Sequence, residues 1–559
     1  MIRARDICPV PRRSLYPGDV SQMTELTRRD FIGAAASLAA ATALPTKVAA
    51  ESTKTAAAPL EEWSIAEVSS AMQRGETTAH ALTQQYLERI AAMDRRGPNL
   101  RYVLETNPDA LAIADALDIE RKSGRLRGPL HGIPVLIKDN IDSADRMTTT
   151  AGSLALEGNV ASRDAHVVEQ LRAAGAIILG KTNLSEWANF RSTHSSSGWS
   201  ARGGQAKNPY ALDRTPSGSS SGSAGAAASN YCVVAVGTET DGSITSPAAA
   251  CSLVGIKPTV GLVSRSGIIP IAHTQDTAGP MTRSVADAAI LLGVLAGRDP
   301  RDEATARISR PIPDYTRDLD ANGLKGARIG VARKKYTGYS PATDAALETA
   351  LRVMKDLGAV IVDPADIATA AKLDDPELEV LLYEFKADLQ KYLATMPAGA
   401  RARTLDDLIA FNRSHTREET AYFGQEIFEM AAKKGPLTDA AYKKALRTCG
   451  TLAREKGLDA TFAKHSLDAL VAPTQGPPAL IDLVNGDPSG GNSTTPCAVA
   501  GYPAITVPMG YASGLPLGLT FMGRAWSEAT LIKFAFAFEH ATRVRVAPRY
   551  LPTAELPVV

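Results

Sequence analysis

Short apolar runs alternate with amphipathic segments along the first half of the chain. Residues 133–137, 176–179 and 231–236 have the length and β-branched content of buried strands. A helical pattern lies between the first two runs, near residues 164–174. Because strands that alternate with helices build βαβ units, this order predicts an α/β fold. We expect a central mixed, mostly parallel β-sheet that is covered by helices on both faces.

The same patterns continue through the second half, with one long interruption. Further strands are predicted at residues 327–331, 469–472, 504–507 and 519–523, and a final helix at residues 528–542. Residues 307–441 are instead rich in charge and in helical pattern after the first of these strands. Variable segments on a rigid scaffold commonly shape a binding pocket. We therefore interpret this part as a largely helical cap.

The first fifty residues differ from the rest of the chain. Arg28 and Arg29 precede an apolar segment of small residues at 31–44, and residues 48–50 offer a small-residue cleavage site. This layout predicts a twin-arginine export signal at residues 1–50, followed by a folded domain at 51–559, and a periplasmic or secreted protein. An apolar segment of about 14 residues is short for a membrane span, so no stable membrane association is expected. A disordered basic extension or a membrane anchor is the alternative.

Composition narrows the possible functions. The 559 residues carry a net charge of +1, and 44% of them are hydrophobic. This is typical of a globular protein and gives no basic field for nucleic acid. The five cysteines show no C-x-x-C spacing, and there is no H-E-x-x-H motif, so neither a metal nor another cofactor is expected.

Residues 217–246 carry the first candidate chemistry. A Ser/Gly loop at 217–222 leads into a small-residue helix at 224–228, and a second turn at 240–243 follows the next strand. Backbone N–H groups around Gly242 can converge as an anion-binding nest, and beside a serine hydroxyl such a nest suits acyl transfer. A flexible linker is the simpler interpretation. A phosphate loop is a further alternative, but the lysine of its G-K-[ST] motif is missing.

A serine nucleophile also needs a base, and a lysine is available. Lys138 ends the apolar strand at 133–137, where loss of solvation disfavours its ammonium form. The alternative is a lysine without a catalytic role, whose ammonium group extends from the strand end into solvent. Lys181, at the end of the following strand, competes for the same role.

A Ser-His-Asp hydrolase is a competing hypothesis. Residues 218–222 match G-x-S-x-G, but no apolar strand directly precedes them, as a nucleophile elbow requires. His131 and His273 lie near the motif segments and are the histidines that such a mechanism would use.

Three separated motifs carry a family resemblance. They read P-L-H-G-I-P-V-L-I-K-D-N at 129–140, P-S-G-S-S-S-G-S-A at 216–224 and G-T-E-T-D-G-S-I-T-S-P-A-A at 237–249. In order and spacing they resemble the amidase signature family, and the match extends over about residues 63–546. Within the family, the runs at 180–190 and 197–205 resemble those of bacterial peptide amidases.

The resemblance implies a Ser-cisSer-Lys triad, with Ser243 as nucleophile, Ser219 as the bridging serine after a cis peptide bond, and Lys138 as base. It further implies an oxyanion hole made by the backbone N–H groups of Thr240, Asp241, Gly242 and Ser243. The substrate-binding residues that it implies are Asp241, Ser220 and Asn183. Asp241 stands where the family usually has glycine, and we expect its carboxylate to point into the cleft and bind N–H groups of an extended peptide.

The resulting hypothesis is a hydrolase of carboxamide C–N bonds that releases ammonia through an acyl-enzyme. Its expected substrate is the C-terminal amide of peptides, and small amides are the broader possibility. Relatives in this family also serve as the glutaminase-type subunit of a tRNA-linked amidotransferase, which is the alternative from another functional class. An export signal argues against that role.

Overall fold

A computed structural model describes residues 61–397, 399–488 and 490–555. The export signal predicted for residues 1–50 lies outside the described residues. No helix within the described ranges is both long and apolar enough to cross a membrane.

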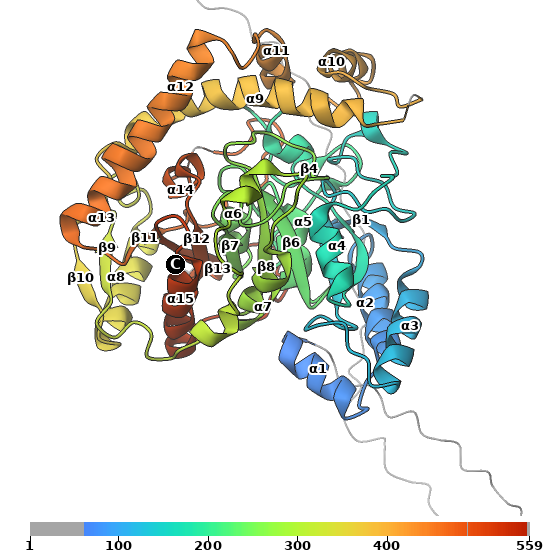
Figure 1. Cartoon of the computed structure of the whole chain (residues 1–559), viewed down its shortest axis with the longest axis horizontal. Coiled ribbons are helices and arrows are strands. Elements are labelled where there is room, and N and C mark those ends of the chain that lie inside the picture. The colour runs from blue at the N-terminus through green and yellow to red at the C-terminus, as the bar shows by residue number, and fades with distance from the viewer. Residues whose placement is uncertain (1–60, 398, 489, 556–559) are drawn as a thin grey trace, which may run out of the picture. The chain divides into compact units, whose positions relative to one another are not determined.

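A sheet of eleven strands forms the centre of the described unit (Figure 1). In spatial order the strands are β1 (Val103–Thr106), β3 (Ile177–Thr182), β2 (Pro134–Lys138), β6 (Val234–Glu239), β8 (Thr277–Thr282), β7 (Val254–Lys257), β12 (Ala504–Ala512), β13 (Leu515–Met522), β11 (Ala469–Pro473), β9 (Arg328–Val331) and β10 (Val360–Val362). The short strands β4 (Trp199–Ser200) and β5 (Gly204–Gln205) pair separately. Each run that was predicted to be a strand contributes to the large sheet.

The sheet is mixed, as expected, but its parallel pairs are confined to two regions. Strands β3, β2 and β6 pair in parallel, and so do β11, β9 and β10. From β6 through β8, β7, β12 and β13 to β11 every pair is antiparallel, as is β1 with β3. Antiparallel pairs therefore outnumber parallel ones, contrary to the emphasis of the prediction. One of these pairs has a local cause, because a turn of two residues joins β12 to β13, whereas parallel pairs need long crossovers.

Two groups of helices cover the sheet, which confirms the α/β class. Helices α4, α7, α15 and α8 form one contacting series, while α5 and α6 contact each other and several of the same strands, among them β3, β7, β8 and β12. The helices are α1 (Ile65–Gln73), α2 (Ala79–Met93), α3 (Ala110–Lys122), α4 (His166–Ala173), α5 (Ser221–Ala228), α6 (Thr245–Ala250), α7 (Val285–Leu295), α8 (Pro341–Asp356), α9 (Asp374–Ala394), α10 (Leu405–Ser414), α11 (Glu426–Ala432), α12 (Ala440–Gly450), α13 (Asp459–His465), α14 (Thr495–Ala500) and α15 (Glu528–Thr542).

The segment at 307–441 contains two different parts. Its first part supplies β9, α8 and β10, which belong to the sheet and its cover. Its second part, α9 to α11, lies along one end of the sheet, in gold and brown in Figure 1. There Phe385 of α9 and Phe428 of α11 pack in one apolar cluster with Trp187 and Phe190, which follow β3. The helices are thus anchored on the loop between β3 and α5.

Candidate active site

Lys138 lies at the carboxyl end of β2, between the parallel strands β3 and β6. Its side chain is fully buried, and its Nζ donates to Ser219 Oγ at 2.7 Å and to Thr238 Oγ1 at 2.9 Å. Burial lowers the pKa of Lys138 to about 7, although the carboxylates of Glu239 and Asp276 oppose the shift. A substantial fraction of this amine is therefore neutral at physiological pH.

Ser219 reaches Lys138 from the loop that precedes α5. The Gly218–Ser219 peptide bond is cis, as the resemblance implied. The small residues of α5 are explained by packing, because a Cβ at Gly222 would collide with the backbone of Asn183, and one at Gly225 with the ring of Tyr102. The loop is thereby held close to β3 and to the end of β2.

Ser243 belongs to the turn between β6 and α6. Gly242 has a φ of +79°, a conformation that favours glycine, and Ser220 N donates to Ser243 O at 3.1 Å. Among the described residues, none of the backbone N–H groups of residues 240–243 donates a hydrogen bond. Glu239 Oε2 instead accepts the next two, from Ile244 at 2.7 Å and Thr245 at 2.9 Å. The turn therefore offers free N–H groups beside a serine hydroxyl.

The two serine hydroxyls are not hydrogen-bonded to each other in the described residues. The backbone contact between Ser220 and Ser243 places their residues side by side, while Ser219 Oγ faces Lys138. Catalytic hydrogen bonds are often long without substrate and tighten in the reacting complex. The geometry thus brings Lys138 and Ser219 into direct contact and Ser243 into their neighbourhood.

Asp241 is held at the same turn. Its Oδ2 accepts a hydrogen bond from Thr495 Oγ1 at 2.7 Å, whereas the buried Oδ1 has no partner among the described residues. Burial raises the pKa of Asp241 to about 6, and the hydroxyls of Thr494 and Thr495 oppose the rise. An unpaired buried acceptor is costly, so this atom is suited to an N–H donor from a ligand.

Two of the expected substrate-binding side chains, those of Ser220 and Asn183, are hydrogen-bonded within the protein. Ser220 is buried, and its hydroxyl donates to Thr238 O at 3.0 Å and accepts from Thr238 N at 3.2 Å. Asn183 is also buried, and its amide binds Arg101 O, Gly204 O, Leu184 N and Ser200 Oγ. Both side chains therefore help to hold the loops around the candidate site, and their contact with substrate stays a prediction.

Neither histidine that the competing hypothesis named contacts the serines. His131 is buried with its ring nitrogens at Leu117 O and Arg127 N. His273 lies between Asp388 and Glu384 of α9. A Ser-His-Asp arrangement is therefore not formed at Ser219 or Ser243.

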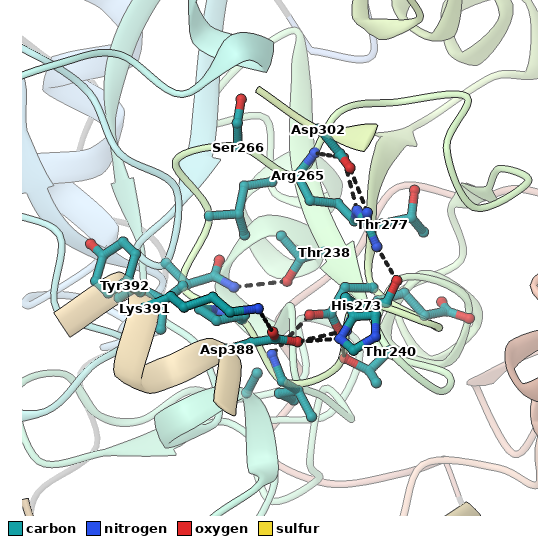
Figure 2. A pocket seen from close by; sticks show the side chains of 18 of the residues that line it. Thr238, Thr240, Arg265, Ser266, His273, Thr277, Asp302, Asp388, Lys391 and Tyr392 are labelled. Carbon is teal, nitrogen blue, oxygen red and sulfur yellow. Dashed lines mark hydrogen bonds and ion pairs between the residues drawn. The ribbon is translucent and has the colours of Figure 1, made fainter. Parts of the chain in front are cut away.

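Two cavities lie close to these residues. One of about 280 Å³ is lined by Ser217, Gly218, Ser246 and Gln475, next to the cis peptide bond. Figure 2 shows another, of about 290 Å³, which Thr238, Thr240 and His273 help to line. Thr238, whose oxygens accept from Lys138, was not predicted from the sequence because it lies beyond the apolar run at 231–236.

Comparisons with known proteins were consistent with this geometry. The family model described as Amidase matches residues 81–532. The chain belongs to the amidase signature family. A probable amidase from Arabidopsis thaliana is 41% identical over 502 residues, which cover 88% of this chain and 92% of the relative. A glutamyl-tRNA(Gln) amidotransferase subunit from Myxococcus xanthus is 39% identical over 505 residues, which cover 86% of this chain and 97% of that relative.

Solved peptide amidases are also similar to this amidase. The peptide amidase of Stenotrophomonas maltophilia is 52% identical, covers 88% of this chain and 99% of its own, and superposes with a TM-score of 0.84. A complex of peptide amidase with the competitive inhibitor chymostatin is 53% identical, with a TM-score of 0.85. The resemblance to peptide amidases is confirmed, and the chain is an enzyme that hydrolyses amide C–N bonds.

Proposed function

We propose that this amidase hydrolyses the C-terminal amide of peptides through Lys138, Ser219 and Ser243. The observation that carries the proposal is the buried contact between Lys138 and Ser219 beside a turn with free N–H groups. The high identity to solved peptide amidases supports the substrate class.

In the proposed reaction, neutral Lys138 accepts the proton of Ser219 as Ser219 accepts that of Ser243. Ser243 Oγ forms a bond to the amide carbon, and the N–H groups of residues 240–243 stabilise the oxyanion. The proton then returns through Ser219 to the amide nitrogen, the C–N bond breaks, and ammonia leaves. Water, deprotonated along the same route, attacks the ester and releases the peptide acid and Ser243.

A comparison of substrates tests the proposed specificity. We would measure kcat/KM for a C-terminally amidated peptide, a small aliphatic amide and free glutamine, following ammonia release. The proposal expects the peptide amide to be hydrolysed fastest, without any added partner protein. Equal turnover of the small amide would indicate a broad amidase, and preference for glutamine would favour the glutaminase-type alternative.

The pKa of Lys138 predicts the pH dependence of catalysis. Since its pKa lies at about 7 and the neutral amine is the active form, kcat/KM should rise with pH and level off above that value. Below that pKa, kcat/KM should fall about tenfold for each unit by which the pH is lowered. A pH profile on an uncharged amidated peptide checks this. A profile that is flat between pH 5 and 9, as rough limits around that pKa, would contradict the role of Lys138.

Replacement of Asp241 by asparagine tests how the peptide is held. The free Oδ1 is proposed to accept an N–H of the bound peptide, so the substitution should raise KM for peptide amides more than it lowers kcat. A small amide without such N–H groups should be affected little. Measurement of kcat and KM for both substrates decides the matter, because equal losses would remove the peptide-anchoring role.

A further inference from the structure

A short segment beside the candidate site is held by one helix of the 307–441 region. Three consecutive residues, His273, Thr274 and Gln275, each bind an acidic side chain of α9. His273 Nδ1 lies 2.6 Å from Asp388 Oδ2, Thr274 N and Oγ1 donate to Glu384 Oε2 at 3.0 and 2.9 Å, and Gln275 Nε2 donates to Glu377 Oε1 at 2.8 Å.

The three acids form one stripe on α9. Glu377, Glu384 and Asp388 are separated by seven and four residues, which places them on the same helix face. All three are buried, although carboxylates are seldom buried without a partner. The three acids therefore bind residues 273–275 and do not form a solvated helix face.

The other end of the segment binds the turn that carries Ser243. Gln275 Nε2 also donates to Thr240 O at 3.3 Å, so its amide bridges Glu377 and Thr240. Asp276 Oδ1 accepts from Thr240 Oγ1 at 2.6 Å, while its Oδ2 accepts from Ile271 N and Ala272 N. Residues 273–276 thus connect α9 to the first residue of the turn.

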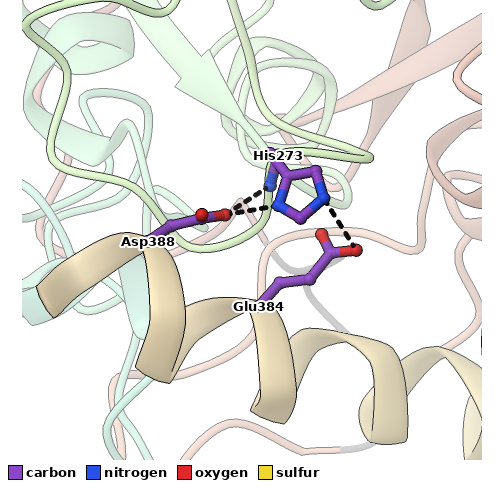
Figure 3. A group of neighbouring side chains, drawn as sticks. All are labelled: His273, Glu384 and Asp388. Carbon is purple, nitrogen blue, oxygen red and sulfur yellow. Dashed lines mark hydrogen bonds and ion pairs between the residues drawn. The ribbon is translucent and has the colours of Figure 1, made fainter. Parts of the chain in front are cut away.

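The contacts of His273 attach the segment to α9 and do not form a metal site. Its ring nitrogens face different carboxylates, Asp388 and Glu384, on opposite sides (Figure 3). The ligand atoms of the three lie within 4.8 Å of one another, but each carboxylate already has a protein donor. Burial lowers the pKa of His273, but the hydrogen bond to Asp388 and the charges of both acids outweigh it and raise the pKa.

The charged and titratable groups around His273 come from several elements. They are Arg265 on the preceding loop with its partner Asp302, Lys391 on α9 beside Asp388, and Tyr442 of α12, whose hydroxyl donates to Glu384. None of them replaces the contact from His273 to α9, so the histidine is central to the attachment.

We propose that residues 273–276 are a positioning segment through which α9 fixes the turn at 240–243. The catalytic consequence rests on the proposed function, in which this turn holds the oxyanion. Movement of a catalytic group by about an ångström costs on the order of a hundredfold in rate, so a loosened segment should lower kcat while leaving KM nearly unchanged.

Gln275→Met tests the bridge, and Thr274→Val is its matched control. Methionine has a similar size but lacks both donors, whereas the control loses one hydrogen bond to α9 and has no side-chain contact with Thr240. We expect Gln275→Met to lower kcat for an amidated peptide by about tenfold to a hundredfold, with KM changed by less than about threefold. The control should stay within about threefold of the parent enzyme.

Hydrogen exchange of the turn gives a readout that does not depend on the substrate. The amides that report on the turn are those of residues 244–246, which donate to Glu239 Oε2 and Gly242 O. They should exchange faster in Gln275→Met and in His273→Gln than in Thr274→Val or Lys391→Met. If the exchange rates at the turn and kcat in Gln275→Met match those of Thr274→Val, the proposed positioning role of residues 273–276 is contradicted. If exchange responds as expected but amidated peptides are not hydrolysed, the proposed function alone fails.

Discussion

Ser243→Ala is expected to abolish turnover of amidated peptides while leaving the fold intact. Alanine removes only the hydroxyl that forms the acyl-enzyme, and in the described residues that hydroxyl makes no hydrogen bond that stabilises the protein. In hydrolases whose triads act as a unit, loss of the nucleophile costs on the order of 10⁶ in kcat. Ammonia release and thermal unfolding, measured on the same sample, separate catalysis from stability.

Ser246→Ala is the matched control for this substitution. Ser246 lies in the first turn of α6, three residues after Ser243, and its loss should lower the rate by less than about tenfold. Retention of near-normal activity by Ser243→Ala would show that another group forms the acyl-enzyme.

Lys138→Met should lower kcat by several orders of magnitude at every pH, about 10³-fold or more. Methionine fills a similar volume without a basic nitrogen, so Ser219 loses the acceptor of its proton. Because the three groups act together, Lys138→Met combined with Ser219→Ala should be little worse than either alone. Single-turnover rates of acylation with an amidated peptide provide the measurement.

Lys181→Met provides an unusually close control for Lys138. Lys181 is also fully buried at a neighbouring strand end, and burial lowers its pKa too, but its Nζ donates to Ile141 O and Thr149 Oγ1. This variant should lose stability and keep its rate per folded molecule. If both lysine variants retained equal activity, Lys138 would not be the base.

The strands and the position of Lys138 were predictable because both follow from local pattern. An apolar run ending in lysine identifies a strand end, and parallel neighbours place such ends together. Asn183 occupies the same kind of position, but its side chain is hydrogen-bonded to protein groups. The direction of its side chain depends on Arg101 and Gly204, which no local pattern connects with it.

Contacts between distant segments could not be predicted from the sequence. His273 and Asp388 are 115 residues apart, and Gln275 and Glu377 are 102 apart. In sequence, the acids of α9 resemble the solvated face of any charged helix. Their burial depends on contacts with residues 273–275, which lie far from α9 in the sequence.

The most direct test is mass spectrometry of a library of C-terminally amidated peptides incubated with the enzyme and with Ser243→Ala. Conversion of an amide to an acid adds about one mass unit at the terminus, and the account predicts this gain for the parent enzyme alone, without internal cleavage. Unchanged amides, internal cleavage, or the same gain with Ser243→Ala would contradict it.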